Sequence, residues 1–152
     1  MGNAPAAPGA DLLGSQLWNN RAMDETWRAD AEQILDELQE KVSARDLSAL
    51  LEFFEDPAVL VGVAGDGRTR DGRRDYLTAI TAQAADVRWD WNETVLFYES
   101  DGALGFAAFG EFVLTDEARE LRAPMRGTFF AVRASDGWRL RQFHGSIPQV
   151  PS

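Results

Sequence analysis

The fold is decided by residues 126–148, RGTFFAVRASDGWRLRQFHGSIP. Apolar and polar residues alternate on both sides of the short break Ser135-Asp136-Gly137, which is typical of two antiparallel strands joined by a tight turn. The same period of two extends back to Val87, with further short polar breaks at residues 100–102 and 115–117. Connections of this length cannot join parallel strands, so we predict an antiparallel meander. The predicted strands are Val87–Tyr98, Ala103–Thr115, Leu121–Ala134 and Trp138–Ser146.

Helical periodicity precedes this meander. We expect Asp24 to cap a long helix with one buried apolar stripe, Asp46 to cap a short helix, and Asp71-Gly72 to begin a third helix. The apolar stripe of the long helix is Trp27, Ala31, Ile34, Leu35, Leu38 and Val42. A β-branched apolar run at residues 58–63 predicts one more strand. Helices followed by strands indicate an α+β fold, with the helices on one face of a curved sheet.

The length of 152 residues predicts one domain, over residues 16–152. Residues 1–15 are rich in Ala, Pro and Gly and show no periodicity, so we expect a flexible N-terminal tail. No apolar run is long enough to span a membrane, and no secretory signal is evident, so we expect a cytoplasmic protein.

Charge and composition exclude several function classes. The formal net charge of −10 disfavours nucleic acids and anionic membranes as partners. The sequence contains no cysteine and a single histidine. Disulfides, thiolate nucleophiles and sites with several histidines around a metal are therefore excluded, and we expect no metal.

The register of the last hairpin determines which side chains share a face, and two registers compete. A two-residue turn at Asp136-Gly137 would pair Ser135 with Trp138. A three-residue loop with Gly137 as a left-handed bulge would instead pair Ala134 with Trp138. We favour the second, which gives the pairs Val132–Leu140, Phe130–Gln142, Thr128–His144 and Arg126–Ser146. It places His144, Thr128, Arg126 and Gln142 on an inner face, beside bulky apolar groups.

His144 is the best candidate for a catalytic group, because an imidazole titrates near neutral pH. Alternatively, it is a structural histidine that bonds to Thr128 or to a backbone carbonyl. Arg126 is expected either to bind a ligand oxyanion or to pair with Glu111. Glu111 lies in an apolar strand; facing inward it would be a plausible base, and facing outward an ordinary surface carboxylate.

Several of these segments resemble the SnoaL-like family of the nuclear-transport-factor-2-like superfamily. The resemblance rests on Arg126-Gly127-Thr128, Asp136-Gly137-Trp138 and His144-Gly145-Ser146, in this order, and on earlier segments near Asp46 and Asp71. It implies a cone in which three helices fold onto a strongly curved antiparallel sheet and enclose a pocket. It also implies a homodimer, often formed through the outer sheet face. The family includes polyketide cyclases, steroid isomerases, dehydratases and association modules, so the fold does not fix the function. The acid and base positions of the characterised enzymes have no clear match here.

We therefore expect a pocket that binds an apolar, carbonyl-containing small molecule without an organic cofactor. If a reaction follows, it is proton transfer of the cyclase, isomerase or dehydratase kind, with His144 and Glu111 moving protons and Arg126 and Thr128 orienting an oxygen. The other expected substrate-binding residues are Gln142, Trp27, Phe54 and Phe130. The alternative is a non-catalytic homodimeric binding or association module. An open pocket holding His144 and a carboxylate would favour the enzyme, and a pocket filled by Trp27 or Phe54 would favour the module.

Overall fold

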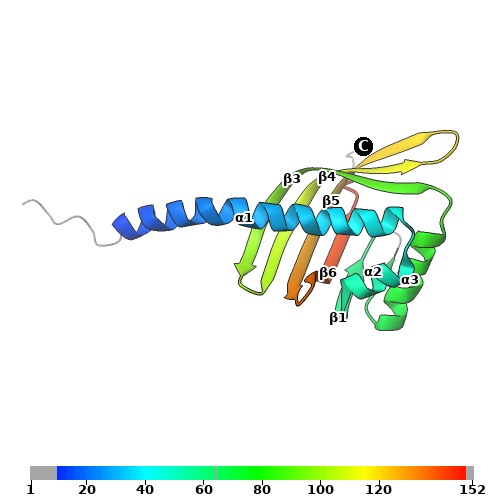
Figure 1. Ribbon diagram of the computed structural model, residues 1–152. Coiled ribbons are helices and arrows are strands. Elements are labelled where there is room, and N and C mark those ends of the chain that lie inside the picture. The colour runs from blue at the N-terminus through cyan, green and yellow to red at the C-terminus, as the bar shows by residue number, and fades with distance from the viewer. Residues whose placement is uncertain (1–9, 64, 150–152) are drawn as a thin grey trace, which may run out of the picture.

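The computed structural model describes residues 10–63 and 65–149, with side chains from residue 26 onward (Figure 1). Apart from a two-residue strand at Asp66–Gly67, the elements follow the order expected from the sequence. The helices are α1 (Ala10–Ser43), α2 (Leu47–Phe53) and α3 (Arg70–Ala82). The strands are β1 (Phe54–Val61), β2 (Asp66–Gly67), β3 (Asp86–Ser100), β4 (Ala103–Thr115), β5 (Glu120–Ala134) and β6 (Gly137–Ser146). The four strands predicted from the meander are confirmed, each within two residues of its expected ends.

The six strands form one sheet in the order β2-β1-β6-β5-β4-β3. β3, β4, β5 and β6 are joined as consecutive antiparallel hairpins, as the short connections required. β1 lies parallel to β6, so the sheet is mixed at that edge. Helix α1 crosses one face of the sheet, and α2 and α3 lie beside β1 (Figure 1). The predicted α+β class, with helices packed on one face of the sheet, is confirmed, although the sheet is mixed and not wholly antiparallel.

Helix α1 is longer than the sequence led us to expect. It begins at Ala10, so Asp24 lies inside the helix and does not cap it. No proline occurs between Pro8 and Pro57, so nothing in this part of the chain blocks helical hydrogen bonding. Residues 1–9 of the predicted tail lie outside the described residues. The predicted apolar stripe is confirmed, because all six of its members are at most 7% exposed.

The two shorter helices begin at side-chain caps. The carboxylate of Asp46 accepts a hydrogen bond from the Ala49 amide at 3.0 Å, as expected for the N-cap of α2. The hydroxyl of Thr69 accepts one from the Gly72 amide at 3.0 Å and caps α3. Both caps satisfy backbone donors that have no partner inside the helix.

The core lies between α1 and the inner face of the sheet. Its centre is Phe129, a fully buried residue of β5. The Phe129 ring stacks on Phe106 at 5.0 Å between centroids and packs at 5.1 Å from Phe143 and 5.9 Å from Trp91. Aromatic pairs at these spacings add to the stabilisation that comes from apolar burial alone.

Gln39 of α1 holds the edge strand β3. Its side-chain amide donates a hydrogen bond to the carbonyl of Val87 and accepts one from the amide of Trp89, both at 2.9 Å. The side chain thus occupies the position that a neighbouring strand would otherwise take. These backbone groups would have no strand partner at the edge of the sheet, so Gln39 supplies the missing pair.

The last hairpin contains a β-bulge that the sequence did not reveal. Phe130 pairs with Gln142, and Thr128 pairs with His144, as predicted. Nearer the turn the pairing shifts by one residue, so that Ala131 lies opposite Leu140. The predicted pairs Val132–Leu140 and Ala134–Trp138 are therefore wrong.

The bulge changes the face on which the polar residues lie. Trp138 and Leu140 point into the core, but after the extra residue Phe143 takes the inner face. His144 and Gln142 consequently lie on the outer face. Arg133 lies beside Trp138 on the inner side, where it pairs with Asp30 of α1 at 3.6 Å and stacks over the indole.

A membrane-spanning helix is not found among the described residues.

Candidate functional site

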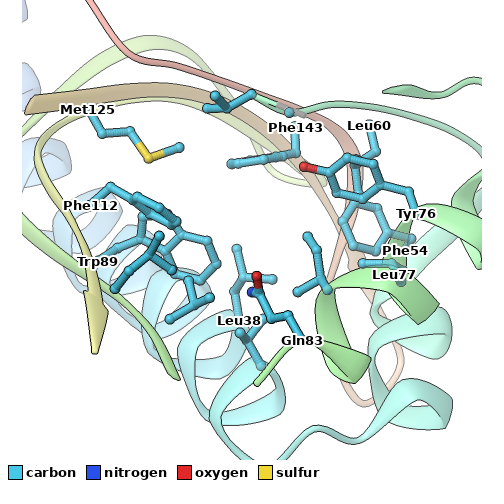
Figure 2. Close-up of a pocket in the computed structure, with 16 residues that line it drawn as sticks. Leu38, Phe54, Leu60, Tyr76, Leu77, Gln83, Trp89, Phe112, Met125 and Phe143 are labelled. Carbon is cyan, nitrogen blue, oxygen red and sulfur yellow. The ribbon is translucent and has the colours of Figure 1, made fainter. Parts of the chain in front are cut away.

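A cavity of about 260 Å³ opens between the helices and the inner face of the sheet (Figure 2). Its walls come from α1, α3, β1 and the long strands, and 16 residues line it. They are Leu38, Val42, Phe54, Leu60, Gly62, Val63, Tyr76, Leu77, Ile80, Gln83, Val87, Trp89, Phe112, Leu114, Met125 and Phe143. The lining is predominantly apolar and aromatic, which is the usual composition of a small-molecule site.

Helix α3 supplies the polar side of the cavity. Tyr76, Ile80 and Gln83 are spaced four and three residues apart, so they lie on one face of the helix and its C-terminal cap. Figure 2 shows the Tyr76 hydroxyl and the Gln83 amide pointing into the open space. Leu38 and Phe112 approach the same space from α1 and β4.

Gly62 makes room for the Tyr76 hydroxyl. A Cβ atom at residue 62 would lie 1.7 Å from the Tyr76 hydroxyl oxygen and 2.6 Å from the ring carbon that carries it. Any side chain at this position would displace the phenol ring. The glycine therefore fixes where the hydroxyl enters the cavity.

Three polar groups of the lining have no hydrogen-bond partner among the described residues. They are the Tyr76 hydroxyl, the Gln83 side-chain amide and the buried indole nitrogen of Trp89. Of the three, only the Trp89 nitrogen is fully buried, whereas Tyr76 and Gln83 are part-buried. A buried polar group is normally paired, so the unpaired Trp89 nitrogen in an apolar wall favours a ligand that completes it. Together the three groups offer hydroxyl, amide and indole N–H donors, which suit an oxygen acceptor on the ligand.

The cavity carries no charge. None of the 16 lining residues is Asp, Glu, Lys, Arg or His. Burial raises the pKa of the Tyr76 phenol above its ordinary value. The phenol therefore stays neutral near pH 7 and acts as a hydrogen-bond donor rather than as a base.

The structure brings His144, Thr128 and Arg126 together, but on the outer face of the sheet. They line a shallow groove of about 270 Å³ with Phe109 and Ser146. The prediction that they face an inner pocket is therefore wrong, because the bulge in β6 reverses the faces beyond Leu140. The Arg126 guanidinium donates a hydrogen bond to the Ser146 hydroxyl at 3.2 Å.

Glu111 also faces outward, which settles one of the two alternatives left open by the sequence. Its carboxylate pairs with Arg122 at 3.3 Å. The sequence had suggested Arg126 as the partner of Glu111, and that pair is not formed among the described residues. Arg122 also pairs with Asp90 at 3.2 Å, so the three groups belong to one surface ion-pair network. The hydrogen bond from Arg88 is the main cause that lowers the pKa of Asp90. Proton transfer by His144 and Glu111 stays a prediction, and neither residue lines the cavity.

The remaining predicted residues are divided between the two faces. Phe54 lines the cavity, as expected. Trp27 is buried in the core and does not line the cavity. Phe130 lies on the outer face, where its ring packs 5.5 Å from that of Tyr98, and Gln142 lies beside it on β6. Neither Trp27 nor Phe54 fills the cavity.

The family model of the SnoaL-like domain matches residues 31–150. The chain belongs to the SnoaL-like family. Its resemblance to the nuclear-transport-factor-2-like superfamily, predicted from the motifs, is thereby confirmed. A search of curated proteins found no significant match.

Solved structures agree with this SnoaL-like fold. A protein from Streptomyces avermitilis, provisionally named a dehydratase of the NTF2-like family, has a TM-score of 0.71 and 12% identity, covering 83% of this chain and 99% of its own. An NTF2-like superfamily protein from Salmonella enterica has a TM-score of 0.68 and 12% identity, covering 85% and 96%. A protein from Novosphingobium aromaticivorans, provisionally named a scytalone dehydratase, has a TM-score of 0.71 and 9% identity, covering 85% and 89%. At these identities the comparisons show the fold alone.

Sequence reasoning missed the residues that give this SnoaL-like cavity its polar groups. Tyr76, Gln83 and Trp89 were not considered as ligand-binding residues. A usable signal was present: Tyr76 and Gln83 are seven residues apart, about two helical turns, which puts both on one face.

Proposed function

We propose that this SnoaL-like protein binds an uncharged, largely apolar small molecule in the inner cavity. The observation that carries the proposal is a lining of 16 residues without one ionised group. An ionised ligand buried there would lose its hydration and find no counter-charge, which is costly. A neutral ring system that carries one carbonyl or hydroxyl oxygen matches both the apolar walls and the unpaired donors.

The orientation of this ligand would be set by α3. The Tyr76 hydroxyl and the Gln83 amide point into the same space (Figure 2). A ligand oxygen between them would accept hydrogen bonds that the described protein groups leave unmade. Displacing poorly held water from the apolar walls would supply most of the affinity.

Any proton-transfer chemistry in this cavity would have to begin at Tyr76. It is the only titratable group in the lining, and its raised pKa suits hydrogen-bond donation to a carbonyl rather than proton abstraction. Two of the similar structures are provisionally named dehydratases, and these names describe those proteins rather than this chain. The proposed function is therefore ligand binding, without an assigned reaction.

A matched pair of fluorescent probes tests the proposal. N-phenyl-1-naphthylamine is neutral, and 8-anilino-1-naphthalenesulfonate is the same ring system with a sulfonate. We expect the neutral probe to bind with the higher affinity, since no cation lines the cavity to receive the sulfonate. Equal or tighter binding of the sulfonate would contradict an uncharged site.

Two variants on the same helix localise the probe. Ile80→Trp places a larger side chain in the lining and should weaken binding of the neutral probe at least tenfold. Thr78→Trp adds the same ring on the exposed side of α3 and should leave binding unchanged. Loss of binding in both variants, or in neither, would place the probe elsewhere.

We also propose that the outer sheet face joins two copies of the chain into a homodimer. This face exposes Val95, Phe97, Tyr98 and Phe109, which are 41–57% accessible. Apolar residues gathered on one face of a sheet are typical of protein–protein contacts. The groove with His144 lies within the same face, so His144 would contact the partner rather than the ligand.

Sedimentation velocity at micromolar concentration tests the dimer. Phe97→Glu should shift the wild-type dimer to monomer, because a carboxylate would be buried in the contact. Leu121→Glu changes an apolar residue of similar exposure that lies outside this face and should leave the dimer intact. A wild-type protein that sediments as a monomer would overturn this second proposal without touching the first.

A further inference from the structure

A second cleft, of about 410 Å³, lies at the corner where α2 and α3 meet the beginning of β6, and it has the opposite character to the cavity. It contains four of the chain's 15 basic residues: Arg70, Arg73, Arg74 and Arg139. Only two carboxylates, those of Glu52 and Asp56, share the lining. The cleft thus has two more positive than negative side chains, in a protein whose net charge is −10.

Two of the arginines have structural partners and shape the floor of the cleft. Arg73 is 3% exposed; it donates to the Ala58 carbonyl at 2.6 Å and pairs with Asp56 at 3.0 Å. Gly67 allows this packing, because a Cβ atom there would lie 2.7 Å from the Cα atom of Arg73. Arg139 donates to the Glu52 carbonyl and pairs with the Asp136 carboxylate.

The other two arginines have no ion pair or side-chain hydrogen bond in the described part of the chain. Arg70 and Arg74 are exposed, lie one turn apart on α3, and line the same cleft. The carboxylates of Asp71 and Asp75, on the same helix, form no ion pair with either. Each guanidinium therefore keeps its N–H donors available for a ligand.

This arrangement costs stability when the cleft is empty. Like charges four residues apart on a helix repel each other. Arg70 is also the first residue of α3, where the helix dipole disfavours a cation. Asp71, in the same first turn, offsets part of these penalties, and an anion between Arg70 and Arg74 would reduce both further.

We propose that this cleft binds a phosphate group, carried by a small phosphomonoester or present as orthophosphate. A phosphate has a charge of about −1.5 to −2 at pH 7, which matches the excess of two positive side chains. Guanidinium groups bind phosphate oxygens through paired, charge-assisted hydrogen bonds. The Ser48 hydroxyl, on α2, is available as a further donor in the lining.

The phosphate site is separate from the apolar cavity. Phe54 belongs to the lining of both spaces and is 6% exposed, so its ring forms part of the wall between them. The proposal does not rest on the apolar ligand, and either site can fail its test without affecting the other.

Calorimetric titration with orthophosphate and with phenyl phosphate tests the proposal at constant ionic strength, set with chloride. Arg70→Gln/Arg74→Gln should weaken binding of both at least tenfold. Arg68→Gln/Arg119→Gln removes the same charge from exposed positions outside the cleft and should change binding less than twofold. Tighter binding of phenyl phosphate than of orthophosphate identifies an ester as the ligand, and the reverse order identifies free phosphate.

Three results would overturn the proposal. They are no heat of binding to the wild-type protein, equal losses in the two double variants, and undiminished binding in the cleft variant. Arg70→Lys/Arg74→Lys keeps the charge but loses the paired guanidinium donors, so it should bind with intermediate affinity. Circular dichroism of each variant checks that α3 remains folded, and a folded cleft variant that binds normally counts against the site.

Discussion

Replacing Gln39 with alanine tests whether a single side chain secures the edge of the sheet. The substitution removes the hydrogen bond to the Val87 carbonyl and the one from the Trp89 amide. Val87 and Trp89 also line the cavity, so the same change loosens one of its walls. We expect Gln39→Ala to destabilise the protein and to free the Trp89 amide for exchange.

The magnitude follows from the two backbone groups that lose their partner. An unsatisfied buried donor or acceptor costs about 1–3 kcal/mol, and these two are only part-buried, so the lower half of that range applies to each. The total for the two groups is about 2–4 kcal/mol. For a protein of this size, that corresponds to a fall in Tm of about 4–16 °C.

Gln33→Ala is the matched control. Gln33 is exposed on the same helix and bonds only to Glu37, four residues away, at 3.3 Å. An exposed pair of this kind is worth about 0.2–0.5 kcal/mol. Both substitutions replace glutamine with alanine within the same helix, so the small stabilisation from the higher helix propensity of alanine is the same in both and cancels in the comparison.

Urea unfolding gives the free energies, and hydrogen exchange followed by NMR gives the protection of individual amides. In the Gln39 variant the Trp89 amide should exchange faster than in the wild type, and in the Gln33 variant it should not. Equal stabilities of the two variants, or an unchanged Trp89 amide, would refute the role assigned to Gln39.

Three further predictions follow from the core, the cavity and a helix cap. Phe129→Ala should cost about 3–5 kcal/mol in urea unfolding, because the ring is fully buried among other aromatic rings; a cost below about 1 kcal/mol would mean that the core repacks. Burial raises the pKa of Tyr76, so this phenol should ionise above pH 10 in the folded protein, and its contribution to stability should be complete below pH 10 and decline as the pH rises further. Ultraviolet titration of Tyr76→Phe, in which Tyr98 is the remaining tyrosine, isolates this transition, and an ionisation below pH 10 would contradict it. Asp46→Ala should cost about 1 kcal/mol through loss of the α2 cap, whereas Asp46→Asn should be nearly neutral, and equal losses would argue against capping.

Much of the fold was predictable because its signals are local. The strands Ala103–Thr115 and Leu121–Ala134 alternate in apolar character and end at short polar turns, so their limits could be read closely. The buried stripe of α1 followed from helical spacing alone. The start of α1 could not be predicted in this way. Asp24 can act as an N-cap, but it does not end a helix whose sequence continues on its N-terminal side.

The site was harder to predict than the fold. A bulge inserts one residue into β6 between Leu140 and Gln142, and neither composition nor turn type marks its position. Because side chains alternate strictly along a strand, this one residue placed His144 on the wrong face in the prediction. The cavity, in contrast, depends on how α3 packs over β1, and that long-range contact leaves no local pattern beyond the spacing of Tyr76 and Gln83.

The bulge in β6 also has a consequence for how such a protein can evolve. Within the hairpin, the residues that face the interior and those that face the exterior differ only by one position in register. Loss of a single codon at the bulge would exchange the two sets without altering any other side chain. An insertion or deletion in this strand is therefore a short route by which a lineage can bring an imidazole into the interior, or remove one from it.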